Sequence, residues 1–133
     1  MADLNLHVDG PHSPERTKEI ADLLAECVRF LNHATMSGNG LDDPADVYYV
    51  LGALYTGTQR LPQLTRQITA VLTAQAATGT LGNNRDSDPA VEVTEAGYDL
   101  LDASVAAETL TTALQTAQQG IAGLYVKGEI PGA

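Results

Sequence analysis

The chain has 133 residues, 44% of them hydrophobic, and 17 acidic residues against seven Lys and Arg give it a formal net charge of -10. This length suits a single domain with its own apolar core. So few basic residues, spread along the chain, argue against direct binding to nucleic acid or to an anionic membrane surface, although a basic protein partner fits the charge.

Cysteine content and hydropathy give the remaining exclusions. Cys27 is the single cysteine, which rules out an intramolecular disulfide and a cysteine-cluster metal site and favours a reducing, cytoplasmic location. The first residues lack the basic and then apolar pattern of an export signal. No segment approaches the roughly 18 consecutive apolar residues of a membrane span.

Residues 1–13 show little apolar periodicity, and we expect them to form a flexible arm. Ser13, Pro14 and Glu15 then supply a capping hydroxyl, a proline at the first helical position and an acid in the first turn. A helix over 14–37 is therefore expected. Its apolar face includes Cys27, which we expect to be buried and inert.

The second helical segment is predicted over 44–78, with Asp43 as its cap and Pro44 in its first turn. Pro62 lies inside this segment, where it removes one backbone donor and clashes with the carbonyl four residues earlier. We therefore expect a kink near Thr58 to Leu61, or a break of the segment into two helices.

The third helix is predicted over 89–124, where Asp88 and Pro89 repeat the start signal of Asp43 and Pro44. This helix organises the rest of the chain. Alternating steps of three and four give an unbroken apolar series at heptad spacing. The series comprises Val93, Ala96, Leu100, Ala103, Ala107, Leu110, Leu114, Ala117, Ile121 and Leu124. It indicates one long buried face with alanine at four of its ten positions, which allows a neighbouring helix to approach closely.

An acidic stripe lies on the first half of this third helix, where Glu92, Glu95, Asp99 and Asp102 fall within about 80° of one another at 100° per residue. The stripe could be solvated only, or it could bind a basic protein in the manner of a DNA mimic. A metal site is disfavoured because a regular helix rarely wraps enough oxygen atoms around a cation. We predict no metal and no cofactor.

A second candidate site lies at the expected kink. Tyr48 and Tyr55 precede it, and Arg60 and Gln63 follow it. Breaks in helices often border pockets, so these four side chains are candidates for lining a small-ligand site. Alternatively, the tyrosines cover the core with their hydroxyls at its rim. We find no catalytic motif and expect no enzyme activity.

Several short stretches resemble a family of uncharacterised, small, all-helical proteins of actinomycetes, often found with plasmid-derived or integrative elements. The stretches lie within about residues 15–75, with a looser match at 115–119. They are the residues 31–35, Leu41, Pro44, Tyr48, 51–54, 60–63 and Gln67. The resemblance implies a bacterial cytoplasmic helical protein and brings no known activity or catalytic residues.

The expected fold is an all-α antiparallel bundle of three long helices, or four if the second is split, within one domain over 14–126. Residues 127–133 form a C-terminal tail. Apolar surface left at one end of such a bundle favours a homodimer. The expected function is that of a non-catalytic interaction or scaffold protein. The alternatives are a ligand-binding regulator with its pocket at the Pro62 kink and an acidic DNA mimic.

Overall fold

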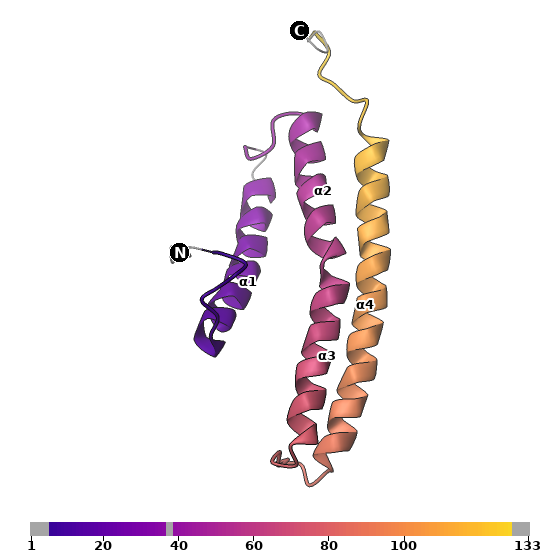
Figure 1. The fold of residues 1–133 in the computed structure, drawn as a ribbon. Coiled ribbons are helices and arrows are strands. Elements are labelled where there is room, and N and C mark those ends of the chain that lie inside the picture. The colour runs from indigo at the N-terminus through magenta and orange to yellow at the C-terminus, as the bar shows by residue number, and fades with distance from the viewer. Residues whose placement is uncertain (1–5, 37–38, 129–133) are drawn as a thin grey trace. The chain divides into compact units, whose positions relative to one another are not determined.

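The computed structural model describes residues 6–36 and 39–128, and the secondary structure of this part consists of helices, turns and coil without strands. The helices are α1 (Pro14–Met36), α2 (Pro44–Gln59), α3 (Leu61–Ala77) and α4 (Pro89–Gly120), as Figure 1 shows. The predicted all-α class is confirmed.

The chain divides into two compact units, Met1–Asp42 and Asp43–Ala133, which are described one at a time. The predictions of a single domain and of a flexible arm and tail stay predictions, and residues 1–5 and 129–133 of the two ends lie outside the described part.

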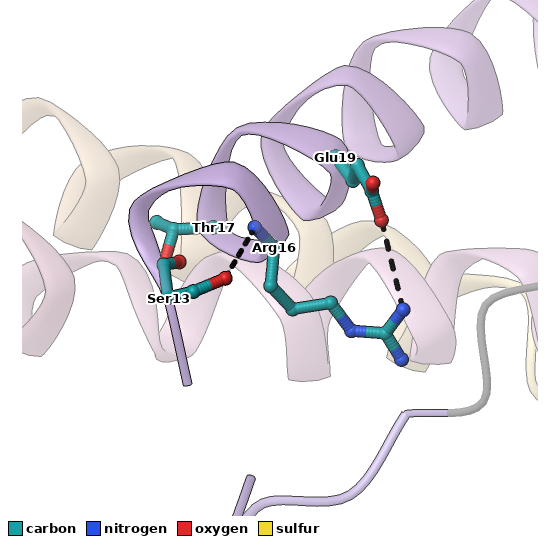
Figure 2. A network of polar contacts seen from close by, with 4 residues as sticks. All are labelled: Ser13, Arg16, Thr17 and Glu19. Atoms are coloured by element: carbon teal, nitrogen blue, oxygen red, sulfur yellow. Dashed lines mark hydrogen bonds and ion pairs between the residues drawn. The ribbon is translucent and has the colours of Figure 1, made fainter. Parts of the chain in front are cut away.

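The first unit contains α1, and Ser13 caps its N-terminus. The Ser13 hydroxyl accepts a hydrogen bond from the backbone N–H of Arg16 at 3.0 Å, and the Thr17 hydroxyl donates to the Ser13 carbonyl at 2.9 Å. Figure 2 shows this turn together with the ion pair between Arg16 and Glu19 at 3.6 Å. The cap satisfies an amide that has no partner within the helix. The helix start predicted at Ser13 and Pro14 is confirmed.

No residue of α1 is buried. Leu24 and Val28, on its apolar face, are 59% and 50% exposed. The Cys27 thiol is also exposed, so the prediction that it is buried is wrong. An amphipathic pattern marks the face on which a residue lies, but burial requires a second surface packed against that face.

The second unit begins with α2, which a complete capping box starts. Asp43 accepts hydrogen bonds from the backbone amides of Ala45 and Asp46, and the Asp46 side chain accepts one from the Asp43 amide. The helix ends at Gln59, and α3 begins at Leu61 with Pro62 in its first turn. The predicted break at Pro62 is therefore confirmed, and the split form of the prediction is the one that occurs.

Both α2 and α3 pack against α4, and they contact each other much less. Figure 1 shows the two following one another along α4, which runs in the opposite direction. Asp88 caps α4 by accepting a hydrogen bond from the Ala90 amide at 3.0 Å. The helix ends at Gly120 rather than at Leu124, because the amides of Ile121 and Ala122 turn back to carbonyls three residues earlier.

The face that α4 turns toward α2 and α3 differs from the predicted heptad series at every second position. Ser104 and Ala107 are buried, the Thr111 hydroxyl donates to that of Thr58, and Gln118 donates to the Tyr48 carbonyl. This contact stripe consists of Val93, Gly97, Leu100, Ser104, Ala107, Thr111, Leu114, Gln118 and Ile121, most of them partly or fully shielded from solvent. The predicted positions Ala103, Leu110, Ala117 and Leu124 are exposed, so four of the ten predicted positions are wrong.

The buried core of the described residues is small and lies at the helix break. It consists of Pro62, Ser104 and Ala107. Thr58 meets Thr111 across the helix pair. The helices are antiparallel, so the residues four positions after Thr58 and four positions before Thr111 lie at the same level. These two residues are Pro62 and Ala107. The small Ala107 and Ser104 side chains let the helices approach closely where the proline ring replaces a regular turn.

In the described part of the chain, none of the helices combines the length and the hydropathy that a membrane crossing requires.

Candidate functional site

The main concave feature of the second unit is a groove between α3 and α4, with a volume of about 650 Å³. Its α3 wall runs from Thr65 to Ala77, and its α4 wall runs from Ala90 to Ser104. Gly97 lies in the groove, and a Cβ atom built there would come 3.5 Å from the Thr69 methyl group. The missing side chain at Gly97 therefore deepens the groove between the two helices.

The threonines that line the groove bond to their own helices. The hydroxyls of Thr65, Thr69 and Thr73 donate to the carbonyls of Pro62, Thr65 and Thr69, at 2.9, 3.0 and 2.9 Å. The Thr94 hydroxyl likewise donates to a carbonyl of α4. Because these hydroxyls already have partners, they gain little by bonding to a ligand. The threonines therefore line the groove without offering free donors.

Large apolar side chains stand exposed on the groove side of α4. Tyr98 is 67% exposed, Leu101 59% and Val105 55%. Together with Thr94 they form a stripe with steps of four, three and four residues, which lies on one flank of the helix. We call Thr94, Tyr98, Leu101 and Val105 the groove stripe. Exposed apolar side chains next to a groove are typical of a surface that receives another chain.

The charges around the groove are unevenly distributed. Arg66 is its one charged lining residue. The contact stripe marks the centre of the inner face of α4, and each further residue turns by about 100° around the helix. On this basis Glu92 and Asp99 lie on the flank opposite the groove stripe. Glu95 and Asp102 lie on the outer face. The lining of the groove therefore contains no acidic residue, although the chain is strongly acidic.

The four residues predicted at the kink do not line this groove. Tyr55 is half-buried, and its hydroxyl accepts a hydrogen bond from Gln115 at 3.5 Å. Tyr48 is 42% exposed, and its backbone carbonyl accepts from Gln118 at 3.2 Å. Arg60 links α2 to α3, and Gln63 is exposed in the first turn of α3. Tyr48 and Arg60 are twelve residues apart, a rise of roughly 18 Å along a helix. The ligand site at the kink stays a prediction.

The acidic stripe has one member with an internal partner. Glu92 is half-buried and accepts a hydrogen bond from the Ser87 hydroxyl at 2.5 Å, and Ser87 in turn accepts one from Asn83. This chain of bonds ties the loop before α4 to its first turn. Glu95, Asp99 and Asp102 are exposed. Within residues 6–36 and 39–128, no three His, Cys, Asp or Glu side chains form a group that could hold a metal ion.

One side chain of the described part has a lowered carboxyl pKa. The Arg29 guanidinium donates to Glu26 at 2.6 Å, and this hydrogen bond holds the pKa of Glu26 below its usual value. Both groups are exposed on α1, and the same pair raises the pKa of Arg29. The pair is a surface ion pair one turn apart, of a kind that contributes little to stability.

Substituting glycines in α2 will measure how much the hydrogen bonds between α2 and α4 contribute. A Cβ atom at Gly57 meets nothing within 4 Å, so Gly57→Ala is expected to raise the free energy of unfolding by about 0.5–1 kcal/mol through helix propensity. A Cβ atom at Gly52 would lie 2.6 Å from Nε2 of Gln118. Gly52→Ala therefore displaces Gln118 from the Tyr48 carbonyl, and we expect little or no gain in stability.

Urea unfolding of both variants, followed by circular dichroism, tests this expectation. Gly57→Ala is the matched control, because it makes the same exchange in the same helix without touching α4. Equal stabilisation by the two substitutions would show that the bond from Gln118 contributes nothing.

Comparisons of the chain with protein-family models, with curated proteins and with solved structures found no match. The groove was not predicted from the sequence, because its walls are mostly threonine, alanine and glycine, which carry no recognisable motif. The signal that could have located it is the spacing of Tyr98, Leu101 and Val105, a second apolar stripe beside the predicted heptad series.

Proposed function

We propose that the protein is a non-catalytic helical interaction protein, and that it associates through the groove and the groove stripe. The observation that carries this proposal is an apolar groove flanked by exposed Tyr98, Leu101 and Val105. The threonine hydroxyls that line the groove donate hydrogen bonds within their own helices. Such a surface gains free energy when another apolar surface removes it from water.

The chemistry of the groove supports an interaction surface better than a reaction site. Its polar lining groups are the threonines and Arg66, which provide no pair of acid and base, and no nucleophile beside a base. The groove is also partly open to solvent, whereas small-molecule sites usually bury most of the ligand. The cytoplasmic location and the accessory role in a mobile element, which the family resemblance implies, are parts of the same proposal.

Native mass spectrometry of the untreated protein, over a range of concentrations, tests this function. We expect a dimer whose share rises with concentration, and whose mass equals that of two chains with nothing added. A monomer at every concentration that carries a small-molecule adduct, lost on denaturation, would contradict the proposal and favour a ligand-binding regulator.

A further inference from the structure

We propose that the groove receives the same face of a second copy, with the two α4 helices antiparallel and crossing near Tyr98. In this arrangement Leu101 of each copy enters the hollow at the small-residue end of the other copy's groove, opposite Thr94. The inference rests on the proposed function and specifies its partner and its geometry.

The two ends of the groove differ in shape. Toward the N-terminus of α4 the wall is formed by small residues, among them Ala90, Thr94 and Gly97. Toward the other end, Leu101 and Val105 stand exposed. An antiparallel pair centred between Gly97 and Tyr98 places Leu101 opposite Thr94 of the second copy, so that a large side chain fills a small position. A parallel pair would instead place Leu101 against Leu101 and leave both hollows empty.

The charges of the chain favour this face over the other exposed apolar face of the second unit. Leu64, Ile68 and Val71 are 42–56% exposed and fall on the flank of α3 opposite Arg66. That flank lies on the same side of the helix pair as Glu92 and Asp99. Two copies that met there would bring their carboxylates together, and like charges placed close together oppose association. The groove has Arg66 and no acidic lining residue.

The area of the face sets the size class of the proposed interface. The stripe from Ala90 to Val105 spans roughly 22 Å, and two helices side by side are roughly 20 Å wide. Each copy therefore offers about 400 Å², so that the pair buries about 800 Å² in total. Interfaces of this size are at the low end for specific complexes. We expect a reversible dimer with a dissociation constant in the micromolar range.

Disulfide trapping tests the antiparallel arrangement. In a Cys27→Ser background, which removes the exposed native thiol, Thr94→Cys and Leu101→Cys are prepared as separate proteins and oxidised mildly, alone and mixed. Because the pairing places residue 94 of one copy opposite residue 101 of the other, we expect the mixture to form a disulfide-linked heterodimer. Each variant alone should give several-fold less linked product.

Two further variants and one measurement separate the possible failures. Linked product from Thr94→Cys alone and from Leu101→Cys alone, at least equal to that of the mixture, would replace the antiparallel arrangement with a parallel one. Linked product from Ile68→Cys, with none from the mixture, would place the dimer on the other face. Asp102→Cys, on the outer face of α4, measures random collision, and linkage of the mixture at its level would contradict the inference. Sedimentation of the unmodified chain separates these results from failure of the proposed function, because a chain that never dimerises fails both.

Discussion

Replacing Ala107 by Asp is expected to lower the free energy of unfolding of the second unit by about 3 kcal/mol or more. Ala107 is 7% exposed and lies level with the buried Pro62. A carboxylate at this position would lose its hydration without gaining a cationic partner, because the polar side chains bonded nearby are the hydroxyls of Thr58 and Thr111. Urea unfolding followed by helical circular dichroism measures the loss.

Ala106→Asp is the matched control, because Ala106 is exposed and lies next to Ala107 on α4. Both substitutions carry the same loss of helix propensity, which is about 0.7 kcal/mol or less. The difference between the two variants therefore reports the burial at Ala107. If both variants lost the same stability, the tight contact between α4 and the helix break would not exist in solution.

Replacing Leu101 by Glu should weaken self-association at least about 30-fold, equivalent to a loss of roughly 2 kcal/mol, which is the size of effect found at central interface residues. Leu101 is 59% exposed on the groove stripe, so the folded unit tolerates a charge there. In the dimer, the substitution removes an apolar side chain and buries a carboxylate in the hollow of each copy. Sedimentation velocity over a concentration series measures the change.

Leu110→Glu provides the comparison for this experiment. Leu110 is 48% exposed on the same helix, and helical geometry places it on the flank away from the groove stripe. The Leu110→Glu substitution adds the same charge as Leu101→Glu and makes the same exchange of leucine for glutamate. We expect the dimer to survive this substitution with an affinity within a few-fold of the unmodified chain. Equal weakening by Leu101→Glu and Leu110→Glu would indicate that net charge, rather than the groove, controls association.

Local signals in the sequence predicted the helix starts and the break. Ser13, Asp43 and Asp88 each cap a helix whose first residue is a proline, and Pro62 separates α2 from α3. These predictions succeeded because capping and proline geometry depend on a few neighbouring residues and little on the rest of the fold. The C-terminal end of α4 was placed too late, because the apolar spacing continues through Ile121 to Leu124 after the helical hydrogen bonds have ended.

The contact stripe of α4 was predicted in part. Val93, Leu100, Ala107, Leu114 and Ile121 belong to both the predicted and the observed stripe, since both repeat every seven residues. Between these shared positions, each residue of the observed stripe lies one residue after the corresponding residue of the predicted stripe. The observed stripe takes Ser104, Thr111 and Gln118, because their side chains fit a close approach of the helices or bond across to α2. A prediction from hydropathy alone leaves such polar residues out of the core. It therefore selected Leu110 where the structure has Thr111.

The sequence by itself determined the all-helical class, the helix starts, the break at Pro62 and the acidic surface of α4, because each of these follows from the residues of one short segment. The tertiary structure decided which flank of α4 meets α2 and α3, that Pro62 lies level with Ala107, and that α3 and α4 leave a groove at Gly97. These features depend on how two helices distant in sequence are positioned across from one another. That position results from packing between side chains on different helices, which the spacing within either helix does not specify.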